Sequence, residues 1–267
     1  HARMRAPLQE GDFPFPVKYG YAAAGTVTAG MAEMIGRRVF ALAPHQRVHR
    51  ISAAWARPLP ESVPTARAAL AANMETALNA VWDAPIAPGQ RVAVIGLGLV
   101  GLLICSVLGR RADLLLRAVD LVEHRAPIAE AFGAAFVPPG MLQDDHDVVF
   151  HCSASAPGLA EGLAALAFEG TLVETSWYGD RPVSVPLGAA FHSRRLRMIS
   201  SQVGHVAPSR RAAYSHADRL DRAITMLDDP RLDLLITDEV AFEALPERLP
   251  ALLDSSAEGV ATRVIYA

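Results

Sequence analysis

Cysteine is scarce in this sequence of 267 residues, which contains two, Cys105 and Cys152. Both stand in apolar stretches, so a disulfide framework and a four-cysteine zinc site are excluded. We expect a cytoplasmic protein, because so few cysteines fit a reducing compartment. Lysine is scarcer still: Lys18 is the single lysine among 25 basic residues.

Excess charge is also lacking, since the net charge is −3. A balance so close to neutral gives no support for binding to nucleic acid or to an anionic membrane. No uncharged apolar run reaches the roughly 18 residues of a membrane-spanning helix. Hydrophobic residues nevertheless make up 51% of the chain, which is enough for a sizeable core.

From residue 91 onwards, short apolar segments alternate with helical ones. Strands are expected at 92–95, 114–120, 147–150, 171–175 and 196–200, and helices at 100–109, 125–132 and 157–168. Apolar strands separated by helices predict a parallel sheet covered on both faces, which is an α/β fold of the doubly wound type. The first sixty residues carry Gly and Pro punctuation with two β-like runs, and a polar helical stretch is expected at 210–227.

The segment "RVAVIGLGLVGLL" contains the pattern G-x-G-x-x-G at Gly96, Gly98 and Gly101. Such a pattern also occurs in ordinary turns, but here it follows an apolar strand and opens a helix. Gly96 permits a tight turn, Gly98 lets the backbone approach a pyrophosphate, and Gly101 allows close packing of helix on strand. The helix start, with Leu99 and Val100, favours the charge of that pyrophosphate.

Asp120 ends the next predicted strand, 19 residues after Gly101. A carboxylate at this spacing is typical of a group that accepts hydrogen bonds from the adenosine ribose. Because it would repel a 2′-phosphate, it favours NAD(H), while NADP(H) stays open. Arg125 either contacts the ribose and softens that preference, or is a solvated arginine at a helix start.

Three stretches together resemble the medium-chain dehydrogenase/reductase superfamily of alcohol dehydrogenase-like enzymes. They are "FPVKYGYAAAGTVTAG", the glycine segment with "AVDLVEHRAPIAEAFGA", and "GVATRVIY". The resemblance implies a Rossmann domain over 75–203. It also implies a β-rich GroES-like catalytic domain over 1–74 and 204–267, lacking its N-terminal segment, and a homodimer formed through the edge of the Rossmann sheet.

Two zinc-ligand positions of the family are replaced, the second by alanines around Ala71 and Ala72, and a third is expected upstream of His1. Where the family has the His-Glu pair of "G-H-E", this chain has Tyr21 and Ala22, and the structural lobe with four cysteines is absent. Tetrahedral zinc needs three or four converging ligands. The sequence therefore resembles a zinc-independent member, with no metal site.

Without zinc, a positioned donor must stabilise the charge that develops on a substrate oxygen. Tyr21 either donates that hydrogen bond or fills the vacated metal position. His45 is a candidate proton shuttle, or a histidine on a surface loop. Glu75, on an otherwise apolar helix, either holds the nicotinamide ribose and relays protons, or pairs with an arginine.

Further cofactor contacts are implied by position at the carboxyl ends of the strands, where ligands of such sheets bind. Ser153, Thr175 and Ser176 follow two strands, and Ser201 with Gln202 follows the last one. Arg263 matches the family arginine that meets the pyrophosphate.

These observations predict a dehydrogenase that uses NAD(H) to interconvert an alcohol and a carbonyl on a small polar substrate. A zinc-free enoyl or quinone reductase using NAD(P)H is the alternative within enzymes. A dinucleotide-binding sensor or scaffold without catalysis is the alternative from another class.

Overall fold

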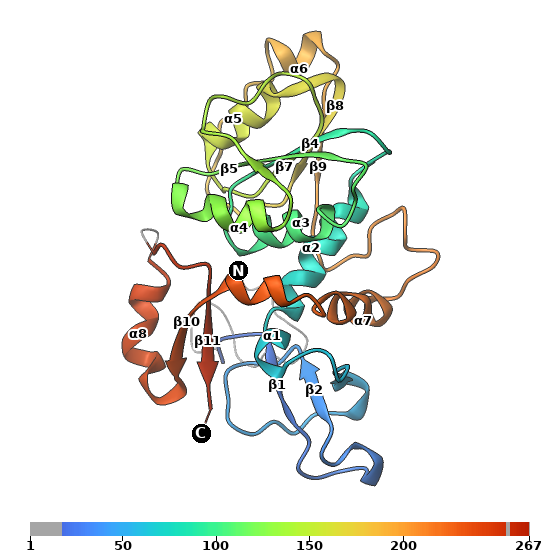
Figure 1. Ribbon diagram of the computed structural model, residues 1–267, viewed down its shortest axis with the longest axis vertical. Helices are drawn as coiled ribbons and strands as arrows, with labels where there is room; N and C mark the ends of the chain where they lie inside the picture. Colours follow the sequence, from blue (N-terminus) through green and yellow to red (C-terminus); the bar gives the residue numbers. More distant parts are fainter. Residues whose placement is uncertain (1–17, 255–256, 267) are drawn as a thin grey trace. The chain divides into compact units, whose positions relative to one another are not determined.

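The structure is a computed structural model that describes residues 18–254 and 257–266. It divides into two compact units, described separately below (Figure 1). Unit 1 contains His1–Glu75 and Leu220–Ala267, and unit 2 contains Thr76–Arg219.

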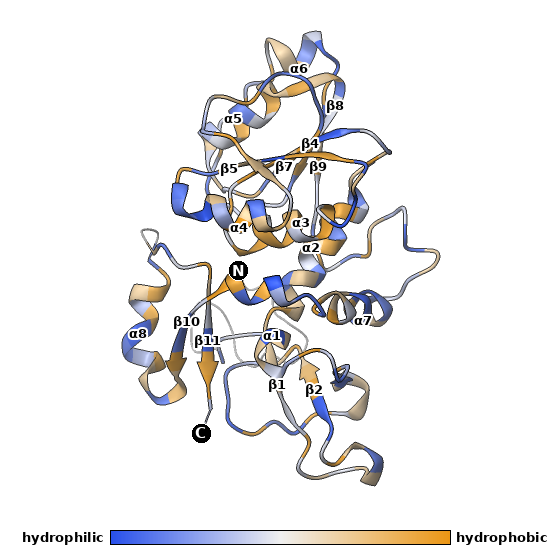
Figure 2. Ribbon diagram, viewed as in Figure 1, coloured by the Kyte–Doolittle hydropathy of each residue, from blue (hydrophilic) through white to orange (hydrophobic). Residues whose placement is uncertain are grey.

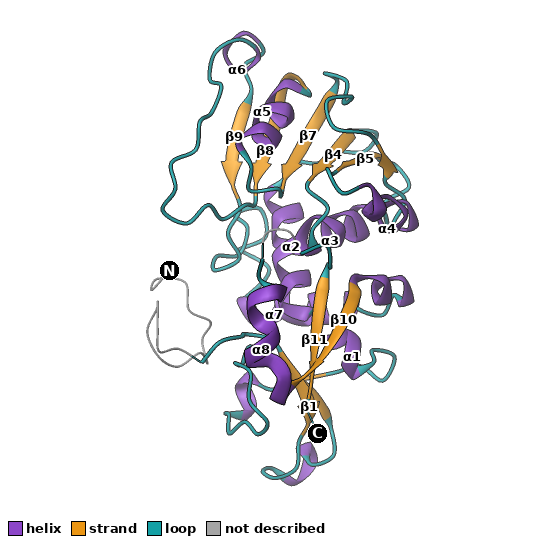
Figure 3. Cartoon of the chain, turned by 90° about the vertical axis from the view of Figure 1, so that its left-hand side faces the viewer, coloured by secondary structure: helices purple, strands orange, loops and turns teal. Residues whose placement is uncertain are grey.

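Unit 2 is built on a six-stranded sheet in which every neighbouring pair is parallel. Its strands are β4 (Arg91–Ile95), β5 (Leu115–Val119), β6 (Ala135–Phe136), β7 (His146–His151), β8 (Leu166–Glu174) and β9 (Arg197–Ser200). Their order is β6-β5-β4-β7-β8-β9, so the chain runs outwards from β4 and then returns to the other side of it. Figure 3 shows β4, β7, β8 and β9 side by side. This is the doubly wound Rossmann sheet that the sequence predicts.

Helices cover both faces of this sheet, as right-handed crossovers in opposite directions require. In Figure 1, α3 (Leu99–Leu108) and α4 (Ala126–Ala131) lie on one side, and α5 (Ala156–Ala164) and α6 (Ala190–Ser193) on the other. Hydrophobic residues gather along α3, coloured orange in Figure 2, where every residue from Gly101 to Leu108 is buried. Under α5, a cluster including Val149, Leu163 and Leu172 fills the core. No helix in the described part of the chain is long and apolar enough to cross a membrane.

Unit 1 contains two small sheets. An antiparallel sheet is formed by β1 (Ala23–Thr26), β2 (Arg38–Ala41) and β3 (Arg57–Pro58), and a parallel pair by β10 (Ile236–Ala241) and β11 (Ala261–Ile265). Its helices are α1 (Thr65–Ala68), the first turn of α2 (Ala71–Asp83), most of α7 (His216–Met226) and α8 (Leu245–Leu252).

An ion pair between the buried Arg67 and the exposed Asp233 ties distant segments of unit 1 together. Arg67 Nε and Nη2 donate to Asp233 at 2.8 and 2.7 Å, and Arg67 Nη1 donates to Leu227 O at 3.1 Å. The hydrogen bond from Arg67 lowers the pKa of Asp233. The Arg67 side chain thus joins α1 to Leu227 and Asp233. Its removal would leave the buried Leu227 carbonyl and the Asp233 carboxylate without this hydrogen-bond donor.

Two predicted helices differ from the structure in their bounds. The helix expected at 210–227 begins at His216, because Ser215 and Asp218 form a capping box in which Ser215 N donates to Asp218 Oδ2 at 2.8 Å. The helix expected at 157–168 ends at Ala164, and β8 already begins at Leu166.

The second domain boundary also lies elsewhere. The sequence assigns 204–219 to the catalytic domain, whereas the structure groups it with unit 2. The buried Arg219 explains this, since its guanidinium donates to Asn79 Oδ1 at 2.6 Å and to His205 O at 3.1 Å. Trp82 packs against Tyr214 with ring centroids 4.8 Å apart. These contacts hold the segment against the second half of α2.

Candidate functional site

The turn between β4 and α3 has the geometry that the glycine pattern predicts. Gly96 has a φ of +96°, and a Cβ there would lie 2.6 Å from Ser153 N. A Cβ on Gly101 would lie 1.9 Å from Gly96 O, so helix and strand pack too closely for any side chain. Gly98 is different, because within the described part of the chain, its own neighbours aside, no atom lies within 4 Å of the position its Cβ would take.

Gly98 is the N-cap of α3, and Leu99 and Val100 follow it in the first turn, half buried. The first amides of a helix have no partner within that helix, and its dipole favours an anion at this end. Open space beside Gly98 therefore leaves room for a phosphate group to approach the backbone.

Asp120 lies at the end of β5 beside this turn, with its side chain 9% exposed. Its Oδ2 accepts a hydrogen bond from Leu97 N in the glycine turn, and its Oδ1 accepts one from Val122 N at 2.7 Å. Arg125 Nη1 lies 3.5 Å from Oδ2, so this arginine pairs with the carboxylate. Oδ1, which accepts one hydrogen bond, keeps a lone pair for a ribose hydroxyl.

Ser153, Thr175 and Ser176 lie at the carboxyl ends of β7 and β8, as expected, but within a hydrogen-bond network. Thr175 Oγ1 donates to His151 O at 2.8 Å, and Ser176 Oγ accepts from Ala154 N at 3.0 Å. Ser153 Oγ lies 2.7 Å from His151 Nε2. The hydroxyls of Thr175 and Ser176 thus link the ends of β7 and β8, while the Ser153 hydroxyl is hydrogen-bonded to the buried His151.

His151 and the carboxylate beside it are not among the site residues that the sequence predicts. His151 is fully buried, and its Nδ1 lies 2.8 Å from Glu174 Oε2 and 3.0 Å from Oε1. Tyr178 OH donates to the same carboxylate at 3.2 Å, and desolvation of this phenol raises its pKa to about 12. A histidine inside the apolar strand "DVVFH" is the signal that could have revealed this network, since a buried polar group needs a partner.

Ser201 and Gln202 follow β9, and both are engaged within the unit. Ser201 Oγ donates to Asp83 Oδ2 at 2.7 Å, and burial raises the pKa of that carboxyl. Gln202 Oε1 accepts from Gly204 N at 2.7 Å. Their contact with a cofactor stays a prediction.

The three catalytic candidates all belong to unit 1. Tyr21 is 46% exposed, and its hydroxyl accepts from Asn73 Nδ2 at 3.4 Å. Glu75 is buried, with 5% of its surface exposed. Asn73 and Glu75 lie two residues apart in α2, so one helix carries both polar groups.

His45 packs beneath the segment that carries Tyr21. Gly20 has a φ of +93°, and a Cβ there would lie 2.6 Å from the His45 ring. His45 Nδ1 is 3.0 Å from Tyr266 OH, and burial lowers the pKa of the imidazole. The histidine is therefore half buried and tied to the C-terminal segment instead of standing on an exposed loop.

Arg263 lies on β11, where its Nη2 donates to Glu239 Oε1 on the neighbouring β10. Its Nε is buried and has no hydrogen-bond partner among the described residues. A contact with a pyrophosphate stays a prediction. Across residues 18–254 and 257–266, no three His, Cys, Asp or Glu side chains gather closely enough to hold a metal ion.

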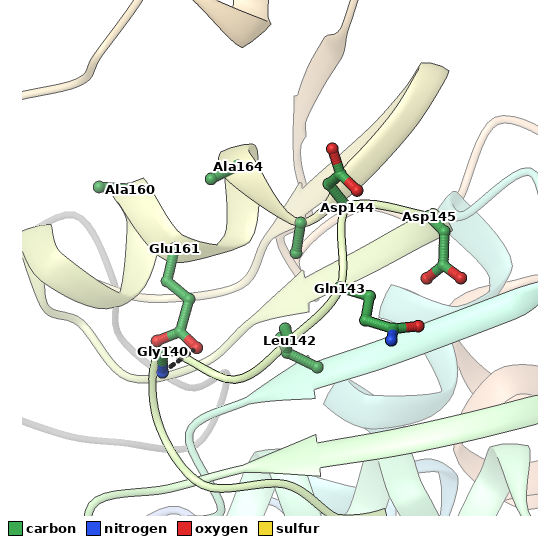
Figure 4. A pocket seen from close by; sticks show the side chains of 9 residues that line it. Gly140, Leu142, Gln143, Asp144, Asp145, Ala160, Glu161 and Ala164 are labelled. Carbon is green, nitrogen blue, oxygen red and sulfur yellow. Dashed lines mark hydrogen bonds between the residues drawn. The ribbon is translucent and has the colours of Figure 1, made fainter.

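The pocket in Figure 4 belongs to unit 2, and none of the candidate residues above lines it. It is lined by the loop before β7, including Asp144 and Asp145, and by one side of α5, including Glu161. Glu161 Oε1 accepts from Gly140 N at 2.7 Å across it. Because the loop enters β7, the pocket is at the amino ends of the strands, opposite the edge where such sheets bind ligands.

The solved structures settle the fold. L-idonate 5-dehydrogenase from Escherichia coli superimposes with a TM-score of 0.76 over 92% of this chain and 81% of its own, at 16% identity. The chain has the medium-chain dehydrogenase fold. At this identity the likeness concerns the fold and does not extend to the substrate.

Curated relatives match part of the sequence. D-xylulose reductase A of Aspergillus oryzae is 30% identical over 148 residues, which are 49% of this chain and 41% of the fungal protein. D-xylulose reductase of Saccharomyces cerevisiae is 31% identical over 148 residues, 48% of this chain and 40% of the yeast protein. The match thus spans about two fifths of these relatives. No family model matches the sequence.

Proposed function

We propose that this chain is an NAD(H)-dependent oxidoreductase that interconverts an alcohol and a carbonyl on a small polar substrate without catalytic zinc. The observation that carries the proposal is the glycine turn, where open space beside Gly98 meets the helix start and the carboxylate of Asp120 lies at the next strand end. Backbone amides suit a pyrophosphate, and the carboxylate suits the ribose diol of NAD(H).

The nicotinamide group supplies hydride transfer when it is bound. The residues of the chain then have to stabilise the charge on the substrate oxygen and supply or remove its proton. We assign the first task to Tyr21. Asn73 donates to the phenol oxygen, so the phenolic proton stays available to the substrate oxygen.

His45 is assigned the proton transfer. The Tyr266 phenol oxygen accepts a hydrogen bond from the backbone N–H of Gln46. The same hydroxyl lies 3.0 Å from His45 Nδ1. When that hydroxyl donates to Nδ1, the neutral ring carries its proton on Nε2. Burial lowers the pKa of His45 and so favours this neutral form, which passes a proton on from Nε2 while Nδ1 takes one from Tyr266 OH, and the two transfers reverse in the opposite reaction. Glu75 is assigned a contact with the nicotinamide ribose.

Zinc-free catalysis is supported by the residue types at the family's ligand positions. Tyr21 and Ala22 replace its His-Glu pair, and a phenol beside a methyl group cannot supply two zinc ligands. The phenol takes over as a hydrogen-bond donor for the developing charge.

We propose small polyols and ketoses as the substrate class. The relatives are named for D-xylulose and the similar solved structure for L-idonate, and these names supply the first compounds to test. The test measures NADH absorbance in the near ultraviolet while the purified protein meets a panel of ketoses and a panel of enones. Oxidation with ketoses supports the proposal. Binding of NADH without turnover on either panel would instead identify a sensor or scaffold.

One observation favours a second candidate, an enoyl or quinone reductase using NADPH. Arg125 lies 3.5 Å from Asp120 and offsets its charge, so a 2′-phosphate is less strongly repelled than by a lone carboxylate. Turnover of enones with NADPH that exceeds turnover of ketoses with NADH would decide for this candidate.

We also propose a cytoplasmic location and a homodimer formed through β9. The two cysteines support the former, because both are free thiols, as a reducing compartment keeps them. For the latter, β9 is the edge strand of the sheet in unit 2 and carries the exposed Met198. Light scattering of the purified protein tests the dimer.

A further inference from the structure

A buried hydrogen-bond network lies at the carboxyl ends of β7 and β8. His151 and Glu174 are direct register partners on these strands, and the imidazole Nδ1 lies within 3.0 Å of both carboxylate oxygens. Burial alone would raise the pKa of Glu174, but hydrogen bonds from His151 and from Ser176 N outweigh it and lower this pKa. An ionised carboxylate accepts and never donates, so the imidazole proton sits on Nδ1.

The position of that proton determines which atoms donate in the hydrogen bonds between His151 and Ser153 and between Ser153 and Ser155. In the tautomer that carries its proton on Nδ1, the imidazole accepts at Nε2, so Ser153 donates its hydroxyl proton to it across 2.7 Å. Ser155 caps α5 by accepting from Gly158 N at 3.1 Å, so its hydroxyl proton points to Ser153 Oγ, 2.9 Å away. The proton of Ser153 is therefore committed, and its oxygen has one lone pair left.

The position of Ser153 indicates what that lone pair meets. Ser153 N would touch a Cβ on Gly96, so this residue borders the glycine turn. It follows β7, which adjoins β4 on the side opposite to β5 and Asp120. A dinucleotide crosses such a sheet where the strand order reverses, with one half on each side. If Asp120 takes the adenosine ribose, Ser153 faces the second ribose.

The same Ser-His-carboxylate arrangement activates the nucleophile of serine hydrolases, but here a needed part is occupied. An acyl-transfer site requires amides aimed at the developing oxyanion. The amides of Ala154 and Gly158, which flank Ser153, donate to Ser176 Oγ and Ser155 Oγ. The geometry favours an acceptor for a ligand hydroxyl over a nucleophile.

We propose that Ser153 Oγ accepts a hydrogen bond from a hydroxyl of the nicotinamide-side ribose, and that His151 and Glu174 are positioning residues which keep it an acceptor. This inference rests on the proposed use of a nicotinamide dinucleotide. It adds a subsite for a ribose hydroxyl to the proposed cofactor site. It also assigns a positioning role to the buried pair His151 and Glu174.

The test compares two probes by isothermal titration calorimetry: ADP-ribose, which has both ribose rings, and ADP, which lacks the second. Ser153→Ala should weaken ADP-ribose binding about five- to tenfold, the effect of one hydrogen bond, and leave ADP unchanged. Ser193→Ala is the matched control, because Ser193 is an exposed serine on α6 whose hydroxyl donates to Ala189 O. It should change neither affinity.

Two substitutions of the histidine separate positioning from mere packing. In His151→Gln the amide oxygen can take the place of Nε2 and still accept from Ser153, whereas His151→Asn reaches only the place of Nδ1. Gln should therefore retain most of the affinity for ADP-ribose, and Asn should lose as much as Ser153→Ala. Circular dichroism checks that both variants fold, and Ser153→Ala decides the question if they do not.

The outcomes are distinguishable. Unchanged ADP-ribose binding by Ser153→Ala, or equal losses for ADP and ADP-ribose, would overturn the Ser153 assignment and leave the proposed function standing. Failure of the unaltered protein to bind ADP-ribose, ADP or NADH would overturn the proposed function and this inference together.

Discussion

In unit 2, the polar side chains at the strand ends are held by several partners, whereas Tyr21 in unit 1 is held less firmly. Asp120 accepts from two backbone amides and meets Arg125, and His151 is bonded at both nitrogens. Tyr21, by contrast, is half exposed and meets Asn73 across 3.4 Å. The proposed cofactor site is thus preorganised by several hydrogen bonds, while the proposed donor to the substrate is constrained by a single long one.

The largest expected effect is a loss of stability on substitution in the glycine turn of unit 2. Gly101→Ala should destabilise the protein by about 3 kcal/mol or more, because its Cβ would overlap Gly96 O. Gly98→Ala is the matched control and should change stability by less than about 1 kcal/mol while weakening NADH binding. Urea unfolding measures the stability of both variants, and titration with NADH measures their affinity for the cofactor. Equal stability losses would contradict the different roles of these glycines.

The next effect concerns the substrate side. Tyr21→Phe removes the phenolic proton and should lower kcat about a hundredfold with little change in stability, because the side chain is half exposed. Tyr19→Phe, at a similarly exposed neighbouring tyrosine, serves as the control and should keep its kcat. A Tyr21→Phe protein with full kcat would remove Tyr21 from the chemistry and leave it a filler of the metal position.

Asp120→Ala should weaken NADH binding about tenfold or more, since a charged hydrogen-bond acceptor for the ribose is lost. NADPH binding should fall less, because the repulsion of its 2′-phosphate is removed at the same time. Fluorescence titration with both cofactors compares them, and equal losses would contradict the ribose assignment. Asp120→Asn, which keeps an oxygen for Leu97 N, controls for damage to the turn.

The features that the sequence predicts differ from those it does not predict in how local their causes are. The glycine pattern, Asp120 and the alternation of strands and helices follow local rules, so the parallel sheet and its turn are predictable from them. The partnership of His151 with Glu174 depends on the register of β7 against β8, which no local pattern encodes. The assignment of 204–219 depends on a long-range contact of Arg219 with Asn79.

The smallest expected effect is a pH dependence of stability in unit 1. Burial lowers the pKa of His45 below the ordinary 6.5, so the unfolded chain binds a proton more readily than the folded one. Stability is therefore fully present above that value and falls as the pH drops through the window below it. His45→Asn should lose less stability than the unaltered protein between about pH 7.5 and about pH 5.5. Parallel urea curves at both pH values check this, and equal losses would place His45 in solvent.

The central claim is dinucleotide-linked redox chemistry on a carbonyl without zinc. It is tested most directly by the rate of NADH oxidation with a ketose panel, before and after the purified protein is dialysed against a strong chelator. We predict turnover that the chelator leaves unchanged. Turnover that is lost with the chelator and restored by zinc would contradict the claim, as would NADH that is never oxidised.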